Sequence, residues 1–359
     1  MEVPDRVQIG WIQLLEFRNH RTLSYSPSPT LNLLVGPNAR GKTNLLEALG
    51  FLLSGRSFRT SRLGEIPRWG AESASVVGEL RRADGARTVR RTIGRLDNGA
   101  WQGSGDDCAW ARAVAFGWHD LDVVNGAPVA RRNFLDGFAA RLYPGHRATL
   151  VRFRQVLARR NLVLQSRLQE SAMAAQLQPW DEQLATVGME LVDRRRRATA
   201  ALQTEIARIV PALAGRRHKT EVRYRASLGE ATEPTAYLAA LERGRRLDTR
   251  RGQTVVGPHR DDLAIELDGV DARVYGSRGQ QRLLALALRL AEVLPIREAV
   301  GTAPVLLLDD ALSELDEGVR ANVLAEIAHA EQVFLTSPEP LAAAGGAHWR
   351  VDEGEVTAA

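Results

Sequence analysis

A short apolar run and a helical leucine pattern stand on either side of a glycine-rich turn early in the chain. The run Leu31–Val35 is apolar at almost every position, which is typical of a strand buried on both faces. From Lys42 onward, leucines recur at the spacing of a single helix face. These leucines are Leu45, Leu46, Leu49 and Leu52. The pattern therefore predicts a strand, a turn over residues 36–43 and a helix, in that order.

The middle of the chain has the composition of long helices. Between Leu121 and Gly215 glycine is scarce, and alanine, leucine, arginine, glutamine and glutamate dominate. One predicted helix face contains Leu150, Phe153, Val156, Leu157, Asn161 and Leu164, and a second contains Leu184, Val187, Leu191, Val192 and Ile206. Pro179 lies between the two faces and predicts the position of the reversal. We therefore expect a helical arm over residues 121–215, built from two antiparallel helices of at most about 45 residues each.

Two further apolar runs lie near the end of the chain. Val305–Leu308 predicts a buried strand that ends on two adjacent acids, Asp309 and Asp310. Gln332–Leu335 predicts another strand, followed by Thr336. The strands and the helix after the glycine-rich turn together predict an α/β head made of residues 1–120 and 216–359, into which the arm is inserted.

Composition and charge narrow the class of protein. The chain has 359 residues, of which 44% are hydrophobic and 25% charged, as in an ordinary globular protein. The net charge of +5 and the pI near 9.8 favour a polyanionic partner. The single cysteine, Cys108, excludes an internal disulfide and suits a reducing cytoplasm. We see neither a signal peptide nor an apolar run of membrane-spanning length, so we expect a cytoplasmic protein.

The turn itself, GPNARGKT, fits the P-loop pattern of phosphate-binding proteins. Gly36 and Gly41 allow successive backbone N–H groups to point at phosphate oxygens, and the helix N-terminus adds its positive end. Lys42 would reach the outer phosphates, and the Thr43 hydroxyl would bind Mg²⁺. This chemistry predicts ATP and Mg²⁺ as cofactors.

The two acids after the second apolar run complete this chemistry. In a P-loop ATPase the first acid, here Asp309, holds Mg²⁺, and the next, Asp310, can orient the attacking water. Adjacent carboxylates at a strand end repel each other unless a cation lies between them. The side chain of Asp310 is one methylene shorter than that of a glutamate and should hold the water less well, so we expect slow hydrolysis, with Asp310, Lys42 and Ser277 as the catalytic residues.

The stretch YGSRGQQRLLALALRLAEVL, from Tyr275, resembles the signature loop of ABC ATPases. Ser277, Gly279 and Gln280 occupy the signature positions and precede a helix, whose N-terminus offers a hydroxyl and N–H groups to an anion. In the ABC fold that anion is the γ-phosphate on the opposite subunit. The resemblance therefore implies an active site completed by dimerisation.

Taken together, the chain resembles the RecF family of bacterial recombination-repair ATPases, whose ABC-type head is related to that of SMC proteins. The motifs that carry the resemblance are LEFRNHRTL, LNLLVGPNARGKTNLLEAL, SGRSFRT, RRNFLD, VVGPHRDDL, YGSRGQQR and LLLDDALSELD. The resemblance implies an ATP-dependent homodimer that binds DNA and promotes recombinase loading on gapped DNA. It also implies roles in DNA replication and the SOS response, DNA-stimulated ATP hydrolysis as the release step, and RecO and RecR as partners.

Further nucleotide-binding residues follow from the resemblance. Arg59 matches a position from which SMC-like heads offer an arginine to the phosphates, and Asn38 matches the P-loop position closest to the γ-phosphate. Thr336 stands at the switch position, and Asp316 matches the D-loop acid at the dimer seam. The other P-loop positions are Pro37, Ala39, Arg40 and Asn44.

The chain departs from the family pattern in AFGWHDLDVV, so either His119 or Asp120 would take the Q-loop part. The segment Val255–Leu263 reads as a loop and strand at the head surface.

Arginines along the arm, together with a second cluster just before Val255–Leu263, predict contacts with the phosphates of duplex DNA or of single-/double-strand junctions. The candidates are Arg131, Arg132, Arg152, Arg154, Arg159, Arg160, Arg194, Arg195, Arg196, Arg197, Arg245, Arg246, Arg250 and Arg251. No base-reading motif accompanies them, so binding should be sequence-neutral.

Two other function classes remain as alternatives. An ABC transporter ATPase subunit shares the head, but the long interval between Thr43 and Ser277 and the threonine at the switch position disfavour it. A monomeric small-molecule kinase shares the P-loop but has no use for a signature loop. ATP-dependent dimerisation with and without duplex DNA separates the three classes.

Overall fold

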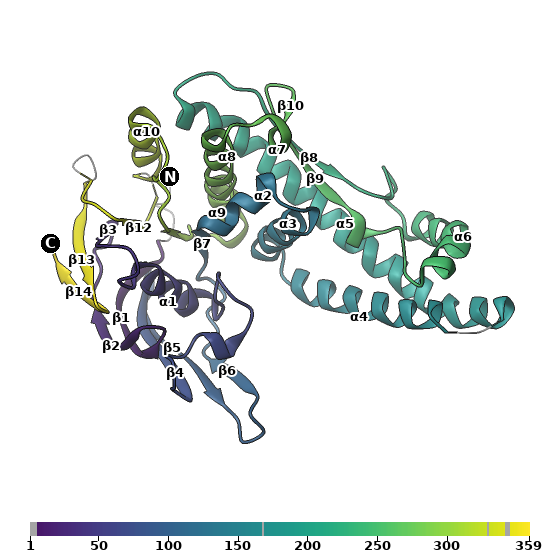
Figure 1. The fold of residues 1–359 in the computed structure, drawn as a ribbon, viewed down its shortest axis with the longest axis horizontal. Helices are drawn as coiled ribbons and strands as arrows, with labels where there is room; N and C mark the ends of the chain where they lie inside the picture. Colours follow the sequence, from purple (N-terminus) through teal and green to yellow (C-terminus); the bar gives the residue numbers. More distant parts are fainter. Residues whose placement is uncertain (1–5, 167–168, 329, 342–344) are drawn as a thin grey trace. The chain divides into compact units, whose positions relative to one another are not determined.

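A computed structural model describes residues 6–166, 169–328, 330–341 and 345–359 (Figure 1). Contacts divide the chain into two compact units. The first unit consists of Met1–Asp120, Arg208–His218 and Arg278–Ala359, and the second consists of Leu121–Ala207 and Lys219–Ser277. Both units contain helices and strands, which confirms the expected mixed α/β class.

A six-stranded sheet forms the centre of the first unit, in the order β14–β13–β3–β12–β11–β7. All neighbouring strands are parallel except the antiparallel pair β13–β14. The strands are β3 (Leu31–Val35), β7 (Ala113–Phe116), β11 (Val305–Leu308), β12 (Val333–Ser337), β13 (Ala347–Asp352) and β14 (Glu355–Ala358). Because the carboxyl ends of β3, β12 and β11 share one edge, the residues that follow these strands meet there.

A second sheet of the first unit is antiparallel and has the order β2–β1–β4–β5–β6. Its strands are β1 (Gln8–Phe17), β2 (His20–Tyr25), β4 (Ser73–Arg82), β5 (Gly85–Arg95) and β6 (Trp101–Gly105). Helix α1 (Lys42–Ser54) packs against strands of both sheets. The predicted leucine face, Leu45, Leu46, Leu49 and Leu52, is fully buried. At about 1.5–3 kcal/mol for each buried leucine, this packing fixes the helix that begins at the P-loop.

Further helices complete the first unit. They are η1 (Leu63–Glu65), η2 (Trp118–Asp120), α8 (Arg278–Leu290), α9 (Val293–Val300) and α10 (Glu317–Ile327). The leucines of α8 are buried, as its helical pattern predicts.

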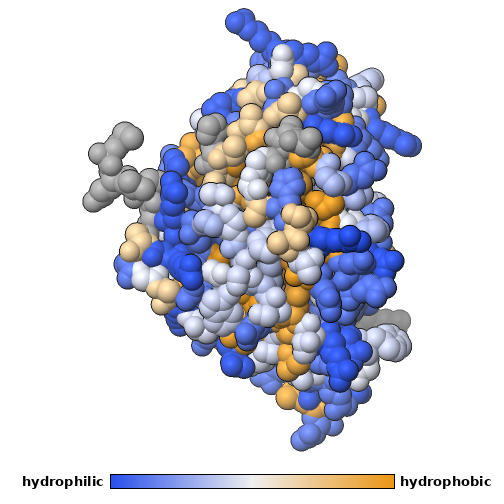
Figure 2. Space-filling view, turned by 90° about the vertical axis from the view of Figure 1, so that its left-hand side faces the viewer, coloured by the Kyte–Doolittle hydropathy of each residue, from blue (hydrophilic) through white to orange (hydrophobic). Residues whose placement is uncertain are grey.

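The face of the molecule in Figure 2 shows a narrow band of hydrophobic residues between larger hydrophilic areas.

The second unit is mainly helical. Its helices are α2 (Leu121–Asn125), α3 (Pro128–Leu142), α4 (His146–Leu164), α5 (Glu170–Ala214), α6 (Pro234–Arg251), η3 (Pro258–Arg260) and α7 (Ala272–Tyr275). A small antiparallel sheet has the order β10–β9–β8, with β8 (Thr220–Arg225), β9 (Asp262–Leu267) and β10 (Val270–Asp271). From Arg208 onward α5 belongs to the first unit. Within the described ranges, no helix is both long enough and apolar enough to cross a membrane.

The contacts group residues 219–277 with the helices of the arm, whereas the sequence placed them in the head. From here on, the arm means the whole second unit. The physical reason is a shared core. Tyr237 and Leu241 of α6 are fully buried and pack in one cluster with Phe153 of α4 and Leu191 of α5. The segment Val255–Leu263, expected at the head surface, therefore lies within the second unit.

The predicted reversal at Pro179 is wrong, because Pro179 lies inside α5. Helix α4 ends at Leu164 and α5 begins at Glu170, well before the proline. Leu177 and Leu184, on either side of the proline, are fully buried. Their burial outweighs the cost of about 3 kcal/mol that a proline imposes inside a helix.

Candidate nucleotide-binding site

The turn between β3 and α1 has a backbone shape that can cradle an anion. A Cβ at Gly36 would lie 2.2 Å from the carbonyl oxygen of Val351, so only glycine fits there. Gly41 has φ +107°, and a Cβ there would lie 2.6 Å from Nδ2 of Asn19. Ala39 is also left-handed, at φ 67°. Left-handed residues within a turn point neighbouring N–H groups toward one side, where the N-terminus of α1 adds positive potential.

The side chain of Lys42 folds back over this turn. Its exposed fraction is 8%, and Nζ donates hydrogen bonds to the carbonyl oxygens of Gly36 at 2.5 Å and Pro37 at 2.9 Å. Burial lowers the pKa of Lys42, while the charges of Asp309 and Asp310 act in the opposite direction. The ammonium group thus lies at the mouth of the turn, where a P-loop lysine contacts the outer phosphates of a nucleotide.

Side chains from three elements meet at the carboxyl edge of the parallel sheet. Oγ1 of Thr43 donates to the carboxylate of Asp309, at 2.8 Å from Oδ2 and 2.9 Å from Oδ1. Oγ1 of Thr336 donates to Oδ1 of Asp309 at 2.9 Å and accepts from the N–H of Asp310 at 2.8 Å. Because β12 lies between β3 and β11, Thr336 reaches both acidic residues and fixes them.

The residues around Asp309 fit a magnesium ion. Burial raises the pKa of Asp309, and hydrogen bonds from Thr43 and Thr336 oppose that rise only in part. A partly buried carboxylate beside a hydroxyl supplies the hard oxygen donors that Mg²⁺ prefers. Thr43 and Asp309 would hold the ion, with phosphate oxygens and water as the remaining ligands.

Asp310 stands at the same edge and is more accessible. Its side chain is 55% exposed, and its backbone has φ 49°, in the left-handed region. Oγ of Ser313 donates to Oδ1 of Asp310 at 2.5 Å, and Arg282 donates to its backbone carbonyl. The other carboxylate oxygen lies 3.8 Å from Nη2 of Arg282. Asp310 is thus an oriented acid with an open side, as a residue that positions water must be.

At the outer part of the P-loop, mainly backbone N–H groups are available to a phosphate. Pro37 and Asn38 are exposed at its tip. The guanidinium of Arg40 is directed to the β13–β14 hairpin, where Nη1 lies 2.9 Å from Oε1 of Glu353 and Nε lies 3.5 Å from Oδ1 of Asp352. The side chain of Arg40 is therefore engaged in ion pairs, and its N–H remains for a phosphate.

A polar cluster adjoins the first turn of α1, and sequence reasoning found only part of it. Nη1 of Arg59 donates to Oδ1 of Asn44 at 2.7 Å and to Oε2 of Glu47 at 3.0 Å. Nδ2 of Asn44 in turn donates to Oδ1 of Asn19 at 2.7 Å. Arg59 and Asn44 were predicted, and the structure brings them together. Asn19 and Glu47 were missed, although an acid within the leucine pattern of α1 was a visible signal.

The signature-like residues lie at the start of α8. Gly279 and Gln280 are in its first turn, and Ser277 is exposed just before it, as the last residue of the second unit. Asp316 is the N-cap of α10, where its carboxylate accepts from the N–H of Val319 at 2.9 Å.

The two Q-loop candidates have distinct surroundings. Asp120 accepts from Arg289 of α8 at 2.5 and 2.9 Å and from the N–H of Gly117 at 2.8 Å. The ring of His119 accepts from Trp118 Nε1 at 3.2 Å. Asp120 is thus held in a structural ion pair. His119 is therefore the candidate whose side chain can change its position more easily.

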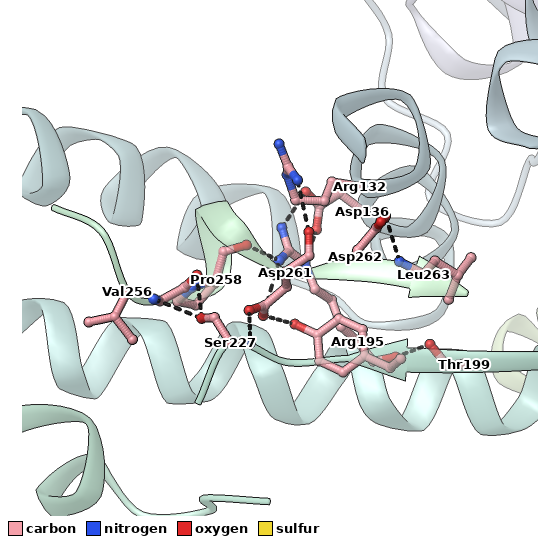
Figure 3. Close-up of polar contacts among 12 residues, drawn as sticks. Arg132, Asp136, Arg195, Thr199, Ser227, Val256, Pro258, Asp261, Asp262 and Leu263 are labelled. Atoms are coloured by element: carbon pink, nitrogen blue, oxygen red, sulfur yellow. Dashed lines mark hydrogen bonds and ion pairs between the residues drawn. The ribbon is translucent and has the colours of Figure 1, made fainter. Parts of the chain in front are cut away.

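Several arginines predicted to contact DNA are buried in the arm instead. Arg195 is 3% exposed and makes a bidentate ion pair with Asp136, with both distances at 2.8 Å (Figure 3). Its Nη1 donates to the carbonyl of Pro258 at 2.7 Å. Arg160 is fully buried and donates to Asp181 at 2.6 Å and to Asp248 at 2.7 Å. Guanidinium groups enclosed in this way have no surface with which to meet a phosphate.

The segment Val255–Leu263 explains much of this burial. The backbone carbonyl of Asp261 accepts from Arg132 at 2.8 Å, and its carboxylate accepts from the N–H of Ser227 at 2.7 Å (Figure 3). The next residue, Asp262, accepts both ends of the Arg131 guanidinium, at 2.7 and 3.1 Å. The motif therefore joins the arm's helices and small sheet through a buried polar network.

The other candidate arginines divide into paired and exposed groups. Arg194 bonds Glu190 and Thr149, Arg196 bonds backbone carbonyls, Arg197 bonds Asp193, and Arg245 lies 3.3 Å from Asp181. The exposed candidates without an ion pair among the described residues are Arg152, Arg154 and Arg159 on α4 and Arg246, Arg250 and Arg251 on α6. The arm's accessible positive charge thus lies on α4 and α6, and not on the arginine run of α5.

Comparisons with known proteins agree with this geometry. A family model described as an AAA domain matches residues 12–113. The DNA replication and repair protein RecF of Heliobacterium modesticaldum is 36% identical, and the match covers 98% of this chain and 99% of that protein. The RecF protein of a Synechococcus strain is 37% identical over 92% of this chain. Full-length similarity to DNA repair proteins does not favour the transporter alternative.

Solved structures give the same result for the fold. A structure described as the recombination mediator protein RecF with ATP, in the RecFOR pathway, superposes with a TM-score of 0.86 at 29% identity, covering 99% of this chain and 100% of that one. An Smc head domain from Pyrococcus furiosus has a TM-score of 0.54 at 17% identity, which shows a shared fold. An ABC-type ATPase head with a helical arm, as the sequence predicts, is thereby confirmed.

Proposed function

The chain belongs to the RecF family of DNA replication and repair proteins, and from this premise we propose that it is an ATP-dependent DNA clamp. Two heads close around ATP, hold DNA while closed, and release it after hydrolysis. The observation that carries the proposal is the meeting of Thr43, Asp309 and Thr336 beside the P-loop. This arrangement supports the proposal, because these groups would bind Mg²⁺ and the phosphates of ATP at one edge of the sheet.

Hydrolysis requires a water molecule aligned with the γ-phosphate, and Asp310 is the residue for this task. Its open carboxylate would orient the water, while Lys42 and the P-loop N–H groups hold the phosphates. Bound Mg²⁺ supplies charge neutralisation of the β- and γ-phosphate oxygens. Positioning by a general base contributes about 10²–10⁴-fold in rate, so the short reach of an aspartate predicts a slow ATPase suited to a switch.

Dimerisation would complete the site. Ser277 and the first turn of α8 present a hydroxyl and backbone N–H groups at a helix N-terminus, a local arrangement that favours an anion. The anion is the γ-phosphate held by the P-loop of a second copy. ATP binding would thus join two heads, and hydrolysis would remove the group that joins them.

The exposed arginines of α4 and α6 are the proposed DNA contacts. Helix α4 contains no acidic residue, so Arg152, Arg154 and Arg159 give its exposed side a net positive charge. Nε2 of Gln165 donates to the carbonyl of Gly252 at 2.9 Å, so the C-terminal ends of α4 and α6 adjoin. Phosphate contacts of this kind carry no sequence information, so binding would favour duplex or junction structure over sequence.

Family membership extends the proposal to partners. The structure that superposes on this chain is described as belonging to the RecFOR pathway. We infer that the DNA-bound dimer acts with RecO and RecR to promote recombinase loading on gapped DNA, in recombinational repair and the SOS response. DNA would stimulate the hydrolysis that ends this state.

Light scattering under different nucleotides tests the proposal. The wild-type chain should dimerise with ATP and Mg²⁺ and remain monomeric with ADP. Ser277→Arg should still bind ATP but should not dimerise, because the substitution brings bulk and charge to the seam. Lys42→Ala should fail earlier, at nucleotide binding. Normal ATP-driven dimerisation of Ser277→Arg would refute the head-to-head arrangement.

A further inference from the structure

Glu47 is a fully buried acid whose carboxylate is saturated with donors. Its oxygen Oε1 accepts from Nη2 of Arg18 at 2.6 Å and from Oγ of Ser57 at 2.6 Å. Its other oxygen, Oε2, accepts from Nε of Arg18 at 2.8 Å and from Nη1 of Arg59 at 3.0 Å. A carboxylate offers about four acceptor sites, so these contacts fill them.

The position of Glu47 along α1 links this carboxylate to the nucleotide site. Residues four apart lie on one helix face, so Glu47 is one turn beyond Thr43, whose hydroxyl bonds Asp309. The helix is held between two sheets by its buried leucines. Glu47 is thus fixed to the same rigid element as the residues that start the P-loop helix.

Arg59 has both a held side and an open side. Nη1 makes the bonds to Asn44 and Glu47, and the side chain as a whole is 35% exposed. Within the described ranges, Nε and Nη2 of Arg59 have no hydrogen-bond partner. Asn44 follows Thr43 directly in the first turn of α1, so its hydrogen bond to Nη1 holds the Arg59 guanidinium beside the start of the P-loop helix.

Charge balance in the cluster leaves an excess for an anion. Two guanidinium groups, Arg18 and Arg59, share the single charge of Glu47. Arg18 is mostly enclosed, with 18% of its side chain exposed, and its Nη1 donates to the carbonyl of Glu65. The open charge therefore belongs to Arg59. A multiply charged phosphate chain is the ligand chemistry that this arrangement fits.

We propose that Glu47 is a positioning residue of the nucleotide site, whose carboxylate holds Arg59 with its open N–H groups toward the phosphates of bound ATP. The inference rests on the proposed function, because it takes ATP as the ligand. Without the Glu47 carboxylate, Nη1 of Arg59 keeps only its hydrogen bond to Asn44. The Arg59 side chain, which is 35% exposed, would then spend most of its time in other rotamers. Glu47 acts through Arg59 and does not itself touch the nucleotide.

A double-mutant cycle on ATP affinity tests this role. We would measure the Kd of the chain for a non-hydrolysable ATP analogue with Mg²⁺, and kcat and KM for ATP, in Glu47→Gln, Arg59→Ala and the double variant. A hydrogen bond to a charged group is worth about 1.5–3 kcal/mol, so each single variant should bind at least about tenfold more weakly. The double variant should be within about threefold of either single variant, since both remove one interaction.

Asp248→Asn is the matched control. Asp248 is also a fully buried acid paired with an arginine, at 2.7 Å from Arg160, and it belongs to the second unit. The Asp248→Asn variant should have a lower melting temperature than wild type but the same Kd for the ATP analogue. Should Glu47→Gln fail to fold, Glu47→Asp takes its place in the cycle, because it keeps the charge and shortens the reach.

The possible results distinguish a positioning role of Glu47 from a purely structural or independent role. A wild-type Kd and KM in Glu47→Gln, together with a lowered melting temperature, would make Glu47 purely structural and overturn the inference. Losses that multiply to about a hundredfold in the double variant would show that Glu47 and Arg59 act independently, which would also overturn it. Failure of the wild-type chain to bind the analogue would refute the proposed function and this inference together.

Discussion

Arg159 and Arg160 are neighbours in sequence but should respond in opposite ways to the same substitution, methionine. Arg160 is fully buried between Asp181 and Asp248, whose side chains are at most 1% exposed. Removing one member of a buried ion pair costs about 3–5 kcal/mol, because the partner charge stays behind. Arg245 lies 3.3 Å from Asp181 and compensates one of the two acids, so we expect the lower half of that range.

Converted to temperature, this loss should be easy to measure. For a domain of about 150 residues, 1 kcal/mol corresponds to about 4 °C, so Arg160→Met should melt roughly 12 °C or more below wild type. Arg159→Met should change the melting temperature by no more than about 2 °C, the effect of a typical surface substitution. Circular dichroism at a helix wavelength follows this transition, because the long helices α3, α4, α5 and α6 lie wholly or mostly in the second unit.

DNA binding below the melting temperature completes the comparison. Arg159→Met should weaken duplex binding and reduce its dependence on salt, whereas Arg160→Met should keep the wild-type salt dependence. Equal melting temperatures for the two variants would refute the assignment of Arg160 to the arm's core. A reduced salt dependence of DNA binding in Arg160→Met alone would show that Arg160 contacts DNA.

Three further outcomes are expected. Asp310→Asn should bind ATP, hydrolyse it more slowly than wild type and accumulate as a dimer; hydrolysis at the wild-type rate would show that another group positions the water. Replacing Arg152, Arg154 and Arg159 together by glutamine should reduce the log–log salt slope of duplex binding by up to about 2.7 for each chain; an unchanged slope would exclude α4 from the footprint. Burial lowers the pKa of His20, whose Nδ1–H donates to the Gly354 carbonyl at 2.8 Å, so the unfolded chain binds the proton more readily. Stability should therefore be fully present above the unfolded pKa of about 6.5 and be lost as pH falls through the lower folded value, and urea titrations of His20→Gln should show a flatter pH dependence.

The P-loop could be predicted from sequence because its geometry is local. Gly36 and Gly41 specify the turn, and the leucines of α1 specify the helix that follows, within a few residues of one another. Asp309 could be placed beside Thr43 because parallel strands bring their carboxyl ends to one edge. The structure places Thr336 at this same edge, with a bonding pattern that no single motif contains.

Arginine burial could not be predicted, because it depends on acids far away in the chain. Arg160 is enclosed through Asp181 and Asp248, and Arg195 through Asp136. A run of arginines looks the same in sequence whether these acids lie beside it or not. The same limit explains Pro179, where tertiary packing of α5 outweighs a local helix-breaking preference.

The central claim is that ATP joins two heads so that two arms hold one DNA molecule. The most direct measurement is the Kd for a fluorescent duplex with a non-hydrolysable ATP analogue and with ADP, at one salt concentration. Two linked sites raise affinity by about 10²-fold or more over a single site, so binding should be at least about 100-fold tighter with the ATP analogue. Ser277→Arg should show the ADP value under both conditions. Equal affinity of the wild-type chain with the two nucleotides would contradict the account.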